Sequence, residues 1–300
     1  YGYSKSTYIS LKDSSVVTTG NNSAGTAVSA RAMMKVENST VSTTGDSSPA
    51  IMIADGGGIL IADGGSFTTS GAMSQGIYSK GDVTVTNASV NALNAKAAVL
   101  KGNNTITLSG TILEGKETAD TIPYNIVLFS DEKDIGTMGT QHFDVRGGSL
   151  ISHKGGMFYV TATHGKISLN GTAITMDDPA ANLITVAGND GANGWGTPGR
   201  NGGHVELVAD NQVLTGNISV DSISNINMTL KNNSTFNGMI SIVPNTEGGE
   251  KYKTNADVFI AAGSTWNLTG NSTLTSLYNL GTINYNGYTI TLADGTVMKA

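Results

Sequence analysis

One sequence pattern occurs twice near the start of the chain, as Ile9-Ser-Leu11-Lys-Asp13-Ser-Ser-Val16 and, about 25 residues later, as Met34-Lys-Val36-Glu-Asn38-Ser-Thr-Val41. In both copies apolar residues alternate with polar ones, which indicates a strand with one buried face. An aspartate or asparagine follows, and these residue types tolerate left-handed backbone angles, so we expect a turn there. Three residues after the turn, another apolar residue is expected to point inward.

The same pattern recurs along the whole chain in about eleven copies. We call the second apolar residue of each copy, such as Leu11 or Val36, its anchor. In most copies the residue two positions before the anchor is also apolar, for example Val205 and Phe259, and we expect it to point inward. Two positions after the anchor the residue is nearly always Gly, Asn or Asp, although one copy has Ala209. Aligned on the second apolar residue, the copies have their anchors at Leu11, Val36, Ala62, Val85, Leu108, Val145, Leu169, Leu207, Leu230, Ala261 and Leu292.

The later parts of each copy suggest two further strands. After the turn, the expected inward residue is displaced by one position in two copies, to Val213 and Phe236. A third short apolar strand then closes many copies, as at residues 51–53, 126–128, 158–160, 184–186 and 240–242.

Such a three-strand unit cannot bury its inner face alone, so successive units must stack. We therefore predict an all-β fold: a right-handed parallel β-helix, a solenoid of about eleven three-strand coils that forms one domain over residues 1–300. A β-sandwich is the alternative, but its strands need no common template of about 25 residues.

The composition favours strands and turns over helices. The chain has 39 glycines, and only 13% of its residues are charged, against about 25% in ordinary domains. The absence of cysteine excludes disulfides and thiol catalysis, and no apolar run approaches the roughly 18 residues of a membrane span. The net charge of −6 argues against nucleic acid as the main partner.

Three intervals between copies are longer than the others, and insertions into stacked repeats form loops on one side of the stack. These predicted insertions lie near residues 114–139, 188–203 and 244–256. Exposed Trp and Arg side chains are frequent binding anchors, which makes the Gly-rich middle segment a candidate binding loop. Alternatively, its tryptophan packs back onto the wall of the stack. The candidate ligand-binding residues in this segment are Asp190, Asn193, Trp195, Arg200 and Asn201.

Arg31 and Lys80 occupy the same position of the repeat two units apart. They are further candidates for ligand binding, because together they would form a local basic strip. The simpler interpretation is that Arg31 and Lys80 lie on the surface by chance, without a shared role.

The threonines Thr18, Thr43 and Thr69 also share one position, in three consecutive units. Stacked threonine rows bind ice on some flat solenoids. An internal hydrogen-bonded ladder is the commoner arrangement, and we favour it here.

Catalytic and metal-binding patterns are weak in this sequence. Asp177 and Asp178 would serve as paired carboxylates of a glycosidase, but they adjoin Pro179 and indicate a turn. His142 and His164 occupy related places in neighbouring units without an acidic third zinc ligand. We therefore predict no enzyme activity, metal or cofactor. The alternative is a polysaccharide lyase or glycoside hydrolase of the same fold, with Asp144 joining the two aspartates.

A resemblance to the last passenger coils of autotransporter adhesins, the pertactin-like and self-associating group, is carried by Gly263-Ser-Thr-Trp266-Asn-Leu-Thr-Gly270-Asn-Ser-Thr-Leu274-Thr-Ser-Leu277-Tyr-Asn-Leu-Gly281-Thr-Ile283. Over the rest of the chain the resemblance is general: coils rich in Gly, Ser, Thr and Asn, and no cysteine. It implies a secreted passenger on the outer surface of a Gram-negative bacterium, acting in adhesion or aggregation. The family's signal peptide and C-terminal translocator barrel are missing from this sequence, so we expect an excised passenger.

This resemblance also implies the kinds of partner to expect. They are further copies of the chain, a host extracellular-matrix protein, or a glycan, with no membrane insertion by this segment. A passive stalk that displays another domain is a third possibility.

Overall fold

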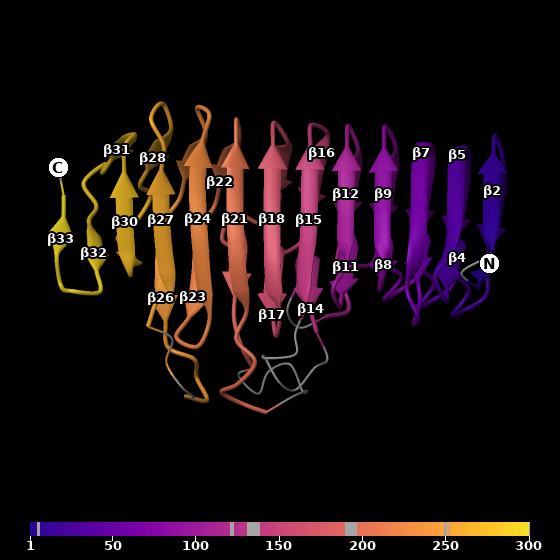
Figure 1. Ribbon diagram of the computed structural model, residues 1–300, viewed down its shortest axis with the longest axis horizontal. Coiled ribbons are helices and arrows are strands. Elements are labelled where there is room, and N and C mark those ends of the chain that lie inside the picture. The colour runs from indigo at the N-terminus through magenta and orange to yellow at the C-terminus, as the bar shows by residue number, and fades with distance from the viewer. Residues whose placement is uncertain are drawn as a thin grey trace.

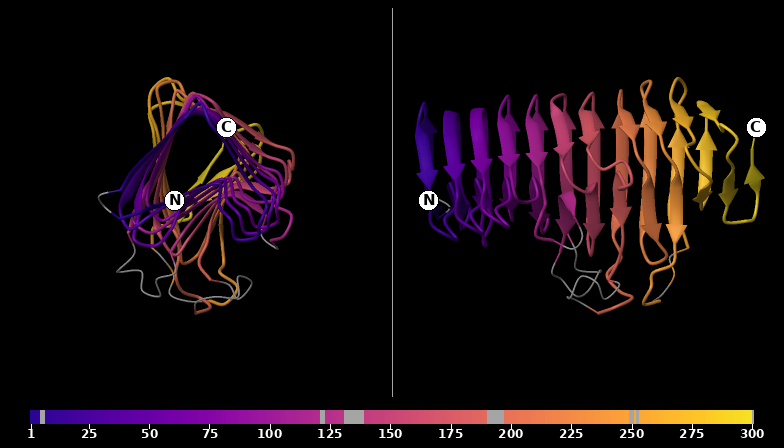
Figure 2. Two further views of the ribbon diagram at one scale, coloured as in Figure 1. Left: turned by 90° about the vertical axis from the view of Figure 1, so that its right-hand side faces the viewer. Right: turned by 180° about the vertical axis from the view of Figure 1, so that it is seen from behind.

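The computed structural model describes residues 1–4, 7–120, 123–130, 139–189, 197–248, 251 and 253–299. Within these residues the chain forms strands, turns and loops, and no helix. The strands lie side by side along one long axis, and an end view shows successive coils around a common axis (Figures 1 and 2).

The strands form three rows, and the first row faces the viewer in Figure 1. It contains β2 (Tyr8–Lys12), β5 (Ala32–Thr43), β7 (Gly58–Thr69), β9 (Asp82–Thr86), β12 (Thr105–Ser109), β15 (Thr140–Arg146), β18 (His164–Asn170), β21 (His204–Asp210), β24 (Asn225–Lys231), β27 (Ala256–Ile260) and β30 (Ser276–Asn279).

The second row shares one sheet with the first, because the long strands β5 and β7 contribute to both rows. Its other strands in this sheet are β3 (Ser15–Thr18), β10 (Ser89–Ala92), β13 (Ile112–Gly115), β16 (Ser149–Ser152) and β19 (Ala173–Met176). A four-stranded sheet follows, with β22 (Val213–Thr215), β25 (Thr235–Asn237), β28 (Thr265–Asn267) and β31 (Thr282–Asn284).

The third row is a ten-stranded sheet followed by a three-stranded one. The larger sheet contains β1 (Gly2–Tyr3), β4 (Thr26–Ser29), β6 (Ile51–Ile53), β8 (Ile77–Ser79), β11 (Ala98–Lys101), β14 (Tyr124–Phe129), β17 (Gly156–Thr161), β20 (Ile184–Val186), β23 (Ile218–Asp221) and β26 (Ile240–Val243). The smaller contains β29 (Ser272–Leu274), β32 (Ile290–Leu292) and β33 (Val297–Met298).

Within each sheet, neighbouring strands of a row pair in parallel, and only β33 is antiparallel to its neighbour among the described strands. The chain visits the three rows in turn, so that β15, β16 and β17 precede β18, which returns to pair with β15. The observed fold is therefore all-β, with a solenoid-like parallel arrangement of strands, as the repeat predicted.

The core lies inside these rows. Inward residues of the first row form columns of buried apolar side chains, one of which runs Ile106, Phe143, Ile167, Leu207 and Met228. Turns between the first and second rows also occur where predicted. Asp13, Asn38 and Asn87 adopt positive φ angles of 47°, 45° and 51°.

Three of the predicted anchors were wrong, two of them through errors of register. In β27 the side chains of Val258 and Ile260 are buried, so the anchor is Ile260 and not Ala261, and Phe259 points outward. In β21 the residue level with Leu169 is Ala209 and not Leu207. The turn after β21 is consequently at Asn211, with φ of 50°.

The copies near the C-terminus needed further correction. Leu214, not Val213, fills the inward position of β22, and Val213 is 58% exposed, whereas Phe236 is buried as predicted. Leu292 does not lie in the first row, because it pairs with Leu274 in the three-stranded sheet. The final first-row strand is instead β30, which the pattern missed.

The threonine ladder is internal, as favoured from the sequence. Thr43 and Thr69 are buried, and the Oγ1 atom of each donates a hydrogen bond to a backbone carbonyl five residues later, on Ser48 and Ser74.

Two of the predicted insertions, 188–203 and 244–256, fall between a third-row strand and the next first-row strand. Within residues 114–139, the segment Tyr124–Phe129 is strand β14 itself, and residues 131–138 lie outside the described part. The described parts of the segments after β20 and β26 extend from the same lower edge in Figure 1. This edge is where the first-row strands begin.

Candidate functional site

A row of polar side chains crosses the outer face of six consecutive first-row strands. Its members share one register level, and neighbouring strands in a sheet are about 4.8 Å apart. We call it the polar row: it consists of His142, Lys166, Glu206, Asn227, Asp257 and Ser276. Polar groups therefore recur at regular intervals along the axis of the molecule.

The charges in the polar row nearly cancel. Lys166 Nζ lies 3.0 Å from Glu206 Oε1, and both side chains are well exposed, so this ion pair adds little stability. Asp257 Oδ1 accepts a 2.5 Å hydrogen bond from Ser276 Oγ. The row thus presents hydrogen-bonding groups, one ion pair and one further carboxylate.

A pocket of about 520 Å³ lies at the centre of the molecule, where the polar row meets a second line of side chains two residues earlier. In this line the rings of His164 and His204 stack, with centroids 4.7 Å apart and planes inclined by 22°. Thr140 and Asn225 flank them on the adjacent strands. The Nδ1 atom of His204 lies 3.0 Å from Asn225 Oδ1.

The stacked histidines differ in exposure, since His164 is exposed whereas His204 is buried. Burial lowers the pKa of the His204 imidazole, and the adjacent His164 acts in the same direction, against the hydrogen bond to Asn225. At neutral pH His204 is therefore uncharged. The His204 side chain therefore lines the pocket as a planar, uncharged imidazole rather than as a cation.

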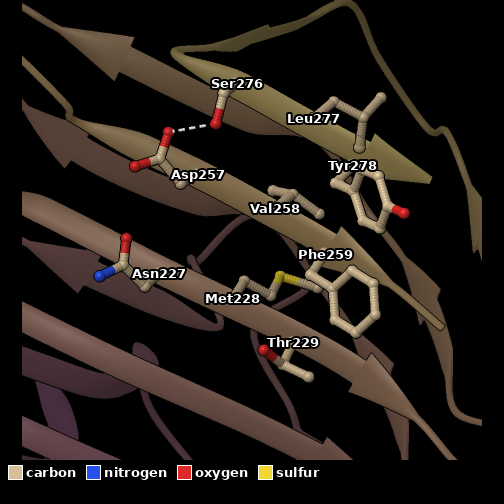
Figure 3. A pocket seen from close by; sticks show the side chains of 9 residues that line it. All are labelled: Asn227, Met228, Thr229, Asp257, Val258, Phe259, Ser276, Leu277 and Tyr278. Carbon is tan, nitrogen blue, oxygen red and sulfur yellow. Dashed lines mark hydrogen bonds between the residues drawn. The ribbon is translucent and has the colours of Figure 1, made fainter.

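A second pocket, of about 360 Å³, adjoins the polar row toward the C-terminus (Figure 3). Its outer wall carries the rings of Phe259 and Tyr278, which stack with centroids 5.6 Å apart and planes inclined by 20°. Asn227 lines both pockets. The two pockets therefore form one track along β15 to β30.

Asp221 forms hydrogen bonds with two of the segments at the lower edge, those that follow β20 and β26. Its buried Oδ2 atom accepts hydrogen bonds from the backbone N–H of Gly188 at 2.8 Å and from Asn245 Nδ2 at 2.7 Å. The segments that begin after β20 and β26 are therefore tied to each other at their bases.

The predicted binding residues of the middle segment divide into two groups. Asp190, Asn193 and Trp195 lie outside the described residues. Arg200 is exposed, and its backbone carbonyl accepts a hydrogen bond from the N–H of Asn189. Asn201 is buried, with φ of 60°, and its carbonyl accepts a bond from Ala162 N–H, which gives Asn201 a structural role.

The two predicted basic residues lie on the turns that follow the third-row strands β4 and β8. Lys80 Nζ lies 2.5 Å from Asp55 Oδ1, on the coil between them, while Arg31 is exposed. The surface here is consequently mixed in charge.

The three aspartates considered for catalysis occupy separate places. Asp144 lies on β15 in the first row, whereas Asp177 and Asp178 follow β19 in the second. Asp178 Oδ1 accepts a hydrogen bond from Ala180 N–H, which is the expected turn geometry.

Asp177 takes part in a bridge across three coils instead. His153 Nδ1 lies 2.7 Å from Asp177 Oδ2, and His153 Nε2 lies 2.5 Å from Glu114 Oε1. These hydrogen bonds, to Asp177 first and then Glu114, raise the pKa of the His153 imidazole above its usual value.

The His153 bridge should make stability depend on pH. A histidine whose pKa is raised by folding adds stability fully below its unfolded pKa of about 6.5, and this is lost as pH rises through the folded value. We expect His153→Gln to lower the melting temperature more at pH 5 than at pH 8. The His153 side chain is 35% exposed, so screening by water keeps the difference small.

An NMR titration tests the cause of this shift directly, since the chain has only four histidines. The His153 ring should titrate above pH 6.5 in the native protein and nearer that value in the Glu114→Gln/Asp177→Asn variant. An ordinary pKa in the native protein would contradict the bridge.

Among the side chains of the track, the sequence pattern singled out only His142 and His164, and it did not place the rings of His204, Phe259 and Tyr278 on the outer face. His204 was misplaced because the copy around Leu207 was aligned two residues out of register. With the correct register, His164-Gly-Lys-Ile and His204-Val-Glu-Leu align residue by residue, a signal that was present in the sequence.

Comparisons with protein-family models, curated proteins and solved structures found no match to this chain. Among the described residues, no helix is long and apolar enough to span a membrane. Nor does that part of the chain hold a group of three or more His, Asp or Glu side chains arranged for a metal ion.

Proposed function

We propose that the chain is a bacterial cell-surface adhesin of the autotransporter passenger type, folded as a right-handed parallel β-helix of about eleven coils. The series of first-row strands from β2 to β30, with its parallel pairing, supports the coil count. The protein is secreted or held at the cell surface through a C-terminal translocator. It acts by aggregation or by attachment to a host matrix protein or glycan.

The polar row is the observation that carries this proposal. A straight face with hydrogen-bonding groups at each coil suits repeated weak contacts with an extended partner. Such contacts sum to useful avidity when many copies are displayed on one cell. The near balance of charge in the row also lets copies approach each other without strong repulsion.

The placement of the acidic groups supports binding rather than catalysis. Hydrolysis of a glycan needs two carboxyl groups about 5–9.5 Å apart across the bond to be cleaved. Asp144 and Asp177 lie on different rows, and Asp177 is bonded to His153. The aspartates considered for catalysis are therefore not arranged as a facing pair, and we propose binding rather than catalysis.

Sedimentation velocity at micromolar concentrations tests the adhesin function. We expect the sedimentation coefficient to rise, either with the concentration of the chain alone or on adding a matrix protein or glycan. Growth of the chain alone would favour aggregation, and a monomer that shifts with one added partner would favour attachment. A monomer that never shifts would contradict the proposal, and one that shortens an added glycan would replace it with an enzyme.

A further inference from the structure

We propose that the outer face of β24, β27 and β30 binds an uncharged glycan, whose pyranose rings pack on Phe259 and Tyr278 while the polar row binds their hydroxyl groups. This inference rests on the proposed adhesin function and assigns the ligand class and its place. Two aromatic rings, those of Phe259 and Tyr278, stack on this face and do not pack in the core.

Both rings are on the outside because of strand register. Phe259 alternates with the buried Val258 and Ile260, and Tyr278 lies level with it on the next strand. Tyr278 is 63% exposed, although an aromatic side chain of this size normally stabilises a fold by being buried. The stacked pair therefore offers an apolar platform to a ligand.

The pocket has two unlike walls, as Figure 3 shows. On one side lie Thr229, Phe259 and Tyr278; on the other, two residues earlier in each strand, lie Asn227, Asp257 and Ser276. A pyranose has the same division, since its C–H groups form an apolar face and its hydroxyls form a polar rim. The Asn227 amide can both donate and accept hydrogen bonds and the Asp257 carboxylate can accept them, so together they meet the needs of hydroxyl groups.

The spacing suits a chain of sugars rather than one. Asn227 continues the polar row into the central pocket, past Glu206 and Lys166 to the histidines. Strands about 4.8 Å apart present one set of groups for nearly each sugar of an extended glycan. A glycan lying along the axis would thus contact both pockets.

Charge on the face decides between glycan classes. Lys166 is paired with Glu206, and Asp257 adds a negative charge next to the aromatic rings. A sulfated or uronic-acid glycan would meet these carboxylates, and the whole chain carries a net charge of −6. The face therefore favours an uncharged ligand.

Binding of unbranched hexasaccharides, measured by isothermal titration calorimetry, tests this inference. The uncharged probes are cello-, chito-, malto- and mannohexaose, and a heparin hexasaccharide is the charged probe. We expect at least one uncharged hexasaccharide to bind and heparin not to bind. Phe259→Ala and Tyr278→Ala should each weaken binding roughly tenfold, because each removes one stacking surface.

Two controls separate loss of contact from loss of fold. Tyr8→Ala removes another exposed outward tyrosine of the first row, on β2, and should leave binding unchanged. Phe259→Tyr and Tyr278→Phe keep the rings and should retain binding. Circular dichroism melts should show all these variants to be folded, since the replaced side chains are on the outer face.

The possible failures are distinguishable. If no uncharged hexasaccharide binds but a matrix protein or heparin does, or the chain self-associates, the glycan inference is overturned and the adhesin function stands. Equal binding by the native chain and both alanine variants would overturn the assigned place. If the chain neither self-associates nor binds any probe or matrix protein, both proposals fail together.

Discussion

Replacing Trp266 by alanine should lower the free energy of unfolding of the C-terminal coils by about 3–5 kcal/mol. The indole is fully buried, and its ring centroid lies 5.6 Å from that of Phe236 on the preceding coil. Its Nε1–H donates a 2.9 Å hydrogen bond to the carbonyl of Gly238. Truncation would leave both a cavity and an unpaired buried acceptor.

Because repeat proteins unfold locally, the loss should be confined to nearby coils. Hydrogen exchange of backbone amides is the suitable measurement, since it resolves β25, β28 and β31 from β9 and β12. Exchange should accelerate in the first group and stay unchanged in the second. Trp266→Phe should cost less, as it keeps an aromatic ring, and an alanine variant with unaltered exchange would contradict this account of the core.

The sequence was sufficient to predict the three rows because every coil must bury its inner face in the same way. Inward columns such as Phe143 and Ile167 leave a period of two that any correct alignment of the copies preserves. The turns are readable for a similar reason, since positive φ favours Asn, Asp or Gly at one fixed position.

The predicted register was wrong where the residues on both faces of a strand are apolar. Residues 258–262 read Val-Phe-Ile-Ala-Ala, so alternation alone gives no preferred face, and a slip of one residue reverses every side chain. This slip hid Phe259 inside the predicted core and with it the aromatic pair. Around Leu207 the slip was two residues, which preserved the face but separated His204 from His164.

The His153 bridge illustrates the opposite case. Its partners Glu114 and Asp177 are far apart in the sequence, yet residue pairing places them on the coils before and after His153. Correct alignment brings such residues to one place, but which rotamers meet depends on side-chain packing. The repeat pattern therefore could not predict the hydrogen bonds of His153 to Glu114 and Asp177.

Removing the charge of Lys96 should also destabilise the fold, by about 3 kcal/mol, because it leaves a buried carboxylate without its cation. Lys96 Nζ lies 3.1 Å from Glu117 Oε2 and 2.9 Å from Asp120 Oδ2. The Lys96 and Glu117 side chains are only 11% and 5% exposed, whereas Asp120 is 44% exposed. The pair with Glu117 is therefore the one that depends on Lys96.

A double-mutant cycle isolates this interaction. Lys96→Met keeps most of the side-chain volume but removes the charge, and Glu117→Gln makes the buried partner neutral. The double variant should be more stable than Lys96→Met alone, because no unpaired buried charge then remains; the Asp120 carboxylate that also loses its cation is 44% exposed. Glu117 Oε1 also accepts hydrogen bonds from the N–H groups of Ala119 and Asp120, and glutamine can keep these with its amide oxygen.

Urea denaturation of the four proteins provides the measurement. If Lys96→Met alone is as stable as the native chain, the two backbone hydrogen bonds suffice to hold the Glu117 carboxylate, and the ion pair contributes nothing. If the double variant is instead the least stable of the four, a glutamine side chain cannot keep the turn after β13, and Glu117 acts through those backbone bonds rather than through Lys96. The expected order, with Lys96→Met below the double variant, requires that the cost come from the uncompensated charge.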